Sequence, residues 1–177
     1  MFAKINSAAL NGLKAISVTL EVNAFLTKGG DGTESTFFMV GLPDNAVRES
    51  KQRVLSALAN SAFRLPRMNV TVNLAPADIR KEGSGFDLPL AVGLLKTTDI
   101  VKADRLDEVA FVGELGLDGT IRSVRGALPI AIEARQQGFK ALFVPKANER
   151  EAGVVNHLKV YGVKTLKEVV DALNGNL

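Results

Sequence analysis

The 177-residue sequence contains no cysteine and a single histidine, His157. Without thiols the chain has no cysteine nucleophile, no disulfide and no thiolate metal ligand, and one imidazole cannot form a histidine cluster. The absence of cysteine also favours a cytoplasmic setting. Cysteine hydrolases, disulfide-stabilised folds and metal sites of the cysteine or histidine-cluster type are therefore excluded.

Aromatic residues and long apolar runs are also scarce. The sequence has no tryptophan and one tyrosine, so an obvious platform for stacking nucleic-acid bases is lacking. No apolar segment approaches the roughly 18 residues that a membrane span needs, and no long apolar run follows the first charge at the amino terminus. We expect a soluble protein without a membrane partner.

The chain lacks the glycine-rich loops of nucleotide-binding proteins. No Gly-Lys dipeptide occurs, which excludes a Walker A loop. Gly113, Gly116 and Gly119 have the wrong spacing for a dinucleotide fingerprint, and we interpret them as turn residues. No cofactor is expected in this chain.

Short strand and helix patterns alternate along residues 1–177 without linkers or repeats, which indicates one domain. Residues 16–22 and 36–40 have strand patterns, and the glycines at 29–32 fit the tip of an antiparallel hairpin between them. Asp44 is suited to cap an amphipathic helix that buries Val47 and Val54. The second half predicts strands at 108–113, 120–124, 141–144 and 158–163, a tight turn at 117–120, and helices at 128–137, 148–153 and 166–173. The fold class is therefore α+β, with a mixed β-sheet packed against helices.

A charged, glycine-rich loop joins a strand pattern to a helix pattern between residues 72 and 88. Such a junction can present a catalytic side chain or an anion site. Ser84 lies three residues before Asp87, as a capping serine does, and we interpret it as a helix cap. Glu114 and Asp118 suggest an acid–base pair, but no histidine or metal set converges on them, which favours structural or surface roles.

Six motifs in a fixed order carry a resemblance to a known family. They are Phe38-Met39-Val40-Gly41-Leu42-Pro43, Arg53-Val54-Leu55-Ser56-Ala57, Val72-Asn73-Leu74-Ala75-Pro76-Ala77-Asp78, Lys81-Glu82-Gly83, Asp87-Leu88-Pro89-Leu90-Ala91 and Val112-Gly113-Glu114-Leu115. Through them the whole chain resembles the amino-terminal domain of the ComM/YifB proteins, also called magnesium-chelatase-subunit-I-like AAA+ proteins. The resemblance implies the fold of the Lon proteolytic domain.

The resemblance to Lon raises a hydrolase hypothesis, because Lon-type peptidases use a serine that a neutral lysine deprotonates. Matching the two sequences places the peptidase serine at Gly85 and the lysine at Leu128, and neither residue can do that chemistry. Ser84 is adjacent, but one residue of helix turns a side chain by roughly 100°. The resemblance therefore implies a noncatalytic domain, with a Ser-Lys hydrolase that uses Ser84 as the remote alternative.

Full-length ComM/YifB proteins join this domain to an AAA+ ATPase module. The resemblance implies that the module, with its ATP and magnesium, is absent from this chain, which would be an excised domain or a truncated member. It also implies a hexameric ring in which the domain supports assembly, DNA engagement or both, during ATP-dependent branch migration in recombination and natural transformation. The alternative is an oligomerisation or regulatory module that makes no DNA contact.

Four basic residues flank the most specific motifs and are our candidates for DNA contact: Arg48, Lys51, Arg80 and Lys81. The net charge of the chain is only +3, so a single domain should bind DNA weakly and without sequence preference. A homo-oligomeric ring would multiply such contacts. The competing interpretation of each residue is a solvated surface charge.

Overall fold

The computed structural model describes residues 1–27 and 35–175. The strands are β1 (Phe2–Asn11), β2 (Lys14–Leu26), β3 (Phe37–Val40), β4 (Met68–Ala75), β5 (Val109–Phe111), β6 (Glu114–Leu115), β7 (Ile121–Arg122), β8 (Ala141–Pro145) and β9 (Lys159–Val163). The helices are α1 (Asn45–Arg48), α2 (Ser50–Asn60), α3 (Asp87–Thr97), α4 (Ala127–Gln136), α5 (Glu149–Ala152) and α6 (Leu166–Asn174), with 3-10 turns η1 (Leu106–Glu108) and η2 (Lys146–Asn148).

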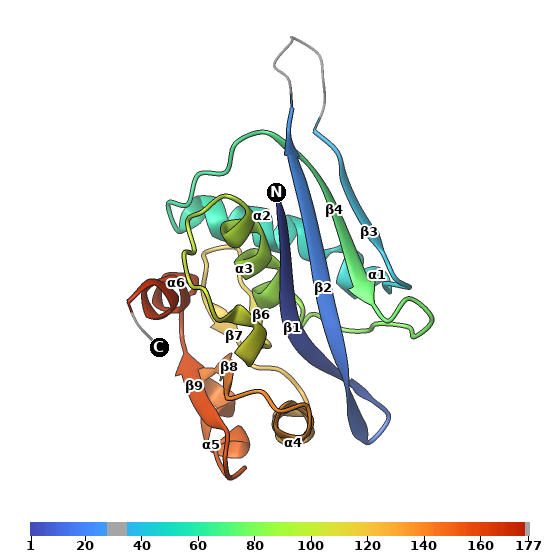
Figure 1. The fold of residues 1–177 in the computed structure, drawn as a ribbon, viewed down its shortest axis with the longest axis vertical. Coiled ribbons are helices and arrows are strands. Elements are labelled where there is room, and N and C mark those ends of the chain that lie inside the picture. The colour runs from blue at the N-terminus through green and yellow to red at the C-terminus, as the bar shows by residue number, and fades with distance from the viewer. Residues whose placement is uncertain (28–34, 176–177) are drawn as a thin grey trace.

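A seven-stranded mixed sheet in the order β3-β4-β2-β1-β5-β8-β9 forms the centre of the fold, and β6 and β7 make a separate pair (Figure 1). The strands β1 and β2 form a long antiparallel hairpin, whereas β5, β8 and β9 are parallel to one another. This arrangement of mixed strands and helices confirms the α+β prediction.

Strand β3 occupies a different place from the one predicted. Residues 16–22 and 36–40 do form strands, but β4 lies between β2 and β3, and β3 pairs with β4 in parallel. The predicted antiparallel hairpin between these two segments is therefore wrong, and its proposed tip at residues 29–32 lies outside the described residues. The physical reason is that β4 alternates strictly, with Val70, Val72 and Leu74 buried, so it takes an interior position between β2 and β3, where this face is covered.

Helices pack on both faces of the sheet. On one face α2, α3 and α6 cover the larger apolar core, and α3 is buried along nearly its whole length. On the other face α4 and α5 cover a smaller core built on β5 and β8. Beyond α4 this second face opens to solvent, where Thr71 on β4 and Phe38 on β3 are exposed.

The second half of the chain follows the predicted order of elements. The turn between β6 and β7 contains Gly119 with φ +87°, and Gly138 with φ +84° ends α4, as expected for glycine in left-handed positions. Strand β7 is shorter than the predicted 120–124. Asp44 caps α1, because its Oδ1 accepts a hydrogen bond of 2.8 Å from the Val47 N–H. The predicted single helix is interrupted by a turn at Glu49, and α2 begins at the next residue. Among the described residues no helix is long and apolar enough to cross a membrane.

Candidate functional site

The resemblance to Lon assigns the peptidase nucleophile and its lysine to two positions, Gly85 in the junction before α3 and Leu128. Helix α3 begins at Asp87, its cap residue is Phe86, and no side chain caps it. The predicted cap by the Ser84 side chain is therefore wrong, because the helix begins too late for that hydroxyl to reach its free N–H groups. The backbone carbonyl of Ser84 acts instead, accepting a hydrogen bond of 3.2 Å from the Asp87 N–H.

A pocket of about 520 Å³ opens over this junction. Its lining includes Ser84, Gly85, Ser123 and Arg125 together with apolar residues of β1 and α4 and with Val112, which follows β5. A Cβ atom on Gly85 would lie 3.1 Å from Cγ2 of Val112. The position of the peptidase serine therefore faces an apolar wall.

The position of the peptidase lysine is also apolar. Leu128 lies in the first turn of α4 and packs against the smaller core rather than lining the pocket. Its backbone N–H donates a hydrogen bond of 3.2 Å to Oε1 of Glu151. Gly85 and Leu128 thus present no ionisable side chain to the pocket.

Lys81 is not a surface charge, so that interpretation is wrong. Only 1% of the residue is exposed, and its Nζ donates hydrogen bonds to the carbonyl oxygens of Gly41, at 2.9 Å, and of Pro76. Burial lowers the pKa of the Lys81 ammonium. In this conformation Lys81 cannot reach a DNA phosphate, and its ammonium is committed to two carbonyls rather than to Ser84.

The other three candidate DNA contacts do reach the surface. Arg48 is exposed and follows the Asp44 cap. Arg80 is exposed and lies 3.5 Å from a carboxylate oxygen of Glu82. Lys51 is half-buried, with its Nζ 5.6 Å from the centroid of the Phe37 ring.

The structure brings two of these three residues close in the fold. Lys81 forms an isolated parallel bridge with Pro43, and the Asp44 N–H donates a hydrogen bond of 2.9 Å to the Lys81 carbonyl. These contacts place the loop that carries Arg80 beside the start of the helix that carries Arg48. Lys51 lies farther along, against β3.

A buried carboxylate near the junction escaped the sequence analysis. Asp87 is fully buried, and its carboxylate accepts hydrogen bonds from Arg53 Nε at 2.6 Å, Arg53 Nη2 at 3.0 Å, the Leu115 N–H at 3.0 Å and the Ser50 hydroxyl. Burial raises the pKa of Asp87 although these bonds oppose the rise, and the carboxylate in turn raises the pKa of Arg53. The cluster joins α2, α3 and β6, so its role is to hold the junction together.

One feature of the sequence could have revealed this ion pair. Asp87 stands between Phe86 and Leu88 at the start of an apolar helix, and a charge in such a position needs a partner. Arg53 and Asp87 also belong to two of the six motifs, so the ion pair connects those motifs in space.

Of the two acidic residues Glu114 and Asp118, Asp118 has the structural role that was favoured. Its Oδ1 accepts hydrogen bonds from the backbone N–H of Thr120, at 3.0 Å, and from the Thr120 hydroxyl, at 2.7 Å. These bonds lower the pKa of Asp118 and fix the turn between β6 and β7. Glu114 is half-buried in β6.

The comparisons with known proteins agree with the motifs. The family model described as subunit ChlI of Mg-chelatase matches residues 27–148. Competence protein ComM of Haemophilus influenzae is 44% identical over 173 residues, which are 98% of this chain and 33% of that protein. The uncharacterized protein YifB of Escherichia coli is 43% identical over 152 residues, which are 86% of this chain and 29% of that protein.

A more distant similarity reaches a peptidase. Lon protease 2 of Bacillus subtilis is 25% identical over 125 residues, which are 70% of this chain and 22% of that protein. The chain thus spans about a third of the length of ComM and YifB and a smaller share of Lon. Since the ChlI model matches more than half of the chain, this chain belongs to the family of subunit ChlI of Mg-chelatase and is homologous to part of ComM and YifB.

Proposed function

We propose that this chain is the noncatalytic, Lon-like domain of a ComM/YifB-type protein, where it supports ring assembly and DNA engagement beside an ATPase module that uses ATP and magnesium. The observation that carries the noncatalytic part is the junction before α3. There the peptidase serine position is Gly85, facing Val112, and the lysine position is Leu128 in an apolar cluster. The link to competence rests on the similarity to competence protein ComM, and the role in DNA engagement is part of the proposal.

The isolated chain is expected to cleave no peptide and to hydrolyse no ATP, because a Ser-Lys mechanism needs both members of its pair. A fluorophosphonate probe should leave Ser84 unlabelled, and turnover of unfolded casein should equal that of the Ser84→Ala variant. Gly85→Ser should also remain inactive, because the lysine is still missing. Labelling at Ser84 together with casein turnover that Ser84→Ala abolishes would instead establish a hydrolase.

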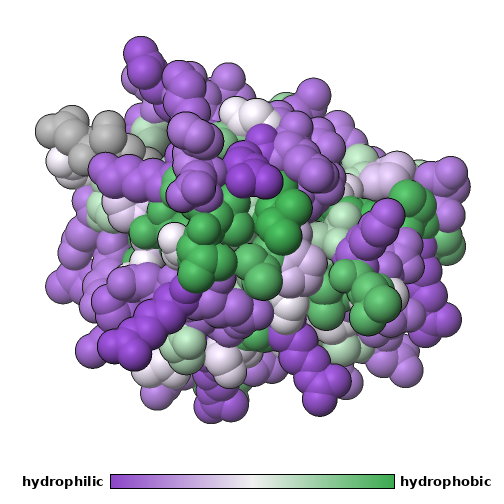
Figure 2. Space-filling model, turned by 90° about the horizontal axis from the view of Figure 1, so that it is seen from below, coloured by the Kyte–Doolittle hydropathy of each residue, from purple (hydrophilic) through white to green (hydrophobic). Residues whose placement is uncertain are grey.

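Assembly is supported by exposed apolar side chains. Leu13 in the turn between β1 and β2 is 97% exposed, and Val154 after α5 is 68% exposed. Both of these elements lie at the lower end of the fold in Figure 1, and the view from below in Figure 2 shows hydrophobic side chains gathering near the middle of that face. A gathered apolar patch on one face, unlike a single exposed residue, is typical of a contact surface.

DNA engagement through Arg48 and Arg80 is expected to be weak in the monomer and strong only in an assembled ring. Charge neutralisation of phosphates makes such binding fall steeply with salt, and each lost contact reduces the slope of log K against log salt by about 1. Fluorescence anisotropy with single-stranded and branched DNA across a salt series would measure this. The variants Arg48→Glu and Arg80→Glu should weaken binding by the assembled full-length protein.

A matched control for these variants is Arg135→Glu, which makes the same charge change at an exposed position of α4. It should leave DNA binding by the ring nearly unchanged. Salt-insensitive binding by the monomer, or no binding by the ring at low salt, would reject DNA engagement and leave oligomerisation as the function of the domain.

A further inference from the structure

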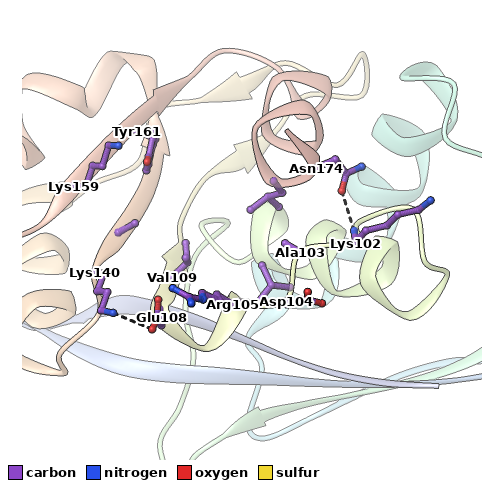
Figure 3. Close-up of a pocket in the computed structure, with 13 residues that line it drawn as sticks. Lys102, Ala103, Asp104, Arg105, Glu108, Val109, Lys140, Lys159, Tyr161 and Asn174 are labelled. Atoms are coloured by element: carbon purple, nitrogen blue, oxygen red, sulfur yellow. Dashed lines mark hydrogen bonds and ion pairs between the residues drawn. The ribbon is translucent and has the colours of Figure 1, made fainter. Parts of the chain in front are cut away.

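A second hollow, of about 530 Å³, lies at the amino-terminal ends of β5, β8 and β9 (Figure 3). Val109, Ala141 and Lys159 are consecutive partners in one row across these three strands. The central residue of this row, Ala141, carries only a methyl group, so its small side chain leaves space between the side chains of Val109 and Lys159. The hollow shares no lining residue with the pocket at the junction before α3.

A row of stacked aromatic rings ends at this hollow. Phe111, Phe143 and Tyr161 are partners across the same strands, and their rings are stacked with centroids 5.1 Å and 4.9 Å apart. The two phenylalanines are fully buried, whereas Tyr161 is half-buried and lines the hollow. A planar group that enters the hollow would therefore meet the aromatic ring of Tyr161.

The rim of the hollow is positively charged. It carries four cationic side chains, Lys102, Arg105, Lys140 and Lys159, against two carboxylates, Asp104 and Glu108. Figure 3 shows Lys140, Glu108 and Arg105 along one side, Lys159 and Tyr161 above them on β9, and Lys102 beside Asn174 on the opposite side.

The cations of the rim are only partly neutralised. Glu108 pairs with Lys140 at 3.0 Å, and the Nζ of Lys159 lies 5.0 Å from the centroid of the Tyr161 ring. Within residues 1–27 and 35–175 the side chains of Lys102 and Arg105 have no ion-pair partner. The electrostatic potential of the hollow therefore favours an anion.

We propose that this hollow binds a nucleoside phosphate. Arg105 would hold the phosphate, because a free guanidinium matches phosphate oxygens in two parallel hydrogen bonds, and Lys102, on the opposite side of the hollow (Figure 3), would add positive charge from farther away. The base would lie against Tyr161, in the place that the Lys159 ammonium occupies in this structure. The Lys159 side chain would turn toward the phosphate when the base binds. A cationic rim beside the Tyr161 ring selects this class, since a neutral nucleoside would use only the ring and pyrophosphate only the rim. Binding requires one domain and no ring, so it does not depend on the proposed DNA contact.

Titration of the isolated chain by calorimetry and by amide chemical shifts would test this site, with AMP, ATP, adenosine and pyrophosphate as separate probes. AMP and ATP should bind and perturb the amides of η1, β9 and the end of α6, with adenosine and pyrophosphate both weaker than ATP. Arg105→Glu should weaken AMP binding about tenfold or more, as expected for loss of a charge-assisted hydrogen bond. Tyr161→Leu should weaken AMP binding but leave pyrophosphate binding unchanged.

The matched control is Lys167→Glu, which reverses the charge of an exposed lysine on α6 outside the hollow and should leave AMP binding unchanged. Arg105 is exposed, so its variant should keep the native amide spectrum, and Lys102→Glu provides a second exposed variant with a smaller expected loss. No binding of AMP or ATP at millimolar concentration, or binding that Arg105→Glu and Lys102→Glu leave intact, would overturn the proposal. Equal affinity for ATP and pyrophosphate, with no effect of Tyr161→Leu, would overturn the assignment to nucleoside phosphates.

Discussion

Replacement of Asp87 by alanine is expected to lower the free energy of unfolding by about 3–5 kcal/mol, the range found when one partner of a buried ion pair is removed. The carboxylate is fully buried and accepts hydrogen bonds from Arg53, Ser50 and Leu115. Its loss would leave the guanidinium without its partner and the Leu115 N–H without an acceptor. Because this cluster joins α2, α3 and β6, the whole junction should loosen, and denaturant titration would measure the change.

The control for this variant is Asp118→Ala, which also removes a carboxylate but at an exposed turn. Its cost should be well below that of Asp87→Ala, because its hydrogen bonds lie in water. If the two variants lost similar stability, or if Asp87→Ala cost less than about 1 kcal/mol, the ion pair would not be what holds the junction.

Replacement of Gly41 by alanine is expected to destabilise the fold by about 3–5 kcal/mol, since it combines two of the costly mechanisms, backbone strain and overpacking. Gly41 has φ +99°, and a Cβ atom there would lie 2.3 Å from the carbonyl oxygen of Leu74. A backbone oxygen cannot rotate away as a side chain can, so β4 or the Gly41 loop would have to move. The carbonyl of Gly41 also accepts the hydrogen bond from the Lys81 ammonium, and movement would disturb that bond too.

The control variant Gly83→Ala measures the cost of backbone strain without the steric clash that Gly41→Ala also introduces. Gly83 has φ +88°, and a Cβ atom there would meet nothing within 4 Å beyond its own chain neighbours, so its cost should be only the left-handed penalty of about 1–2 kcal/mol. Thermal and denaturant unfolding of both variants would give the difference, which measures the close approach of Gly41 to β4. Equal losses for Gly41→Ala and Gly83→Ala would show that this approach contributes nothing.

Local patterns were sufficient to predict most individual elements. The alternation in β2 and β4, the Asp44 cap, the turn after Leu117 and the glycine that ends α4 each depend on residues close in sequence. Physical chemistry over a few residues fixes such features, so they can be recognised without the rest of the chain. The α+β class followed from their order, and the proposal that the domain is noncatalytic rests on the identities of Gly85 and Leu128.

Contacts between distant residues decided the remainder. Sequence proximity suggested a hairpin between β2 and β3, but β4 enters between them because its buried face completes the core. The sequence around Lys81 is typical of a surface charge, but in the fold the loops at Gly41 and Pro76 enclose its side chain. Such burial depends on the whole fold, so local sequence did not reveal it. The ion pair of Arg53 with Asp87 joins residues 34 positions apart, and the hollow around Ala141 requires three strands in register. Sequence determined most of the elements, because they depend on residues close in the chain, whereas only the tertiary structure decided which charges are buried and which are exposed.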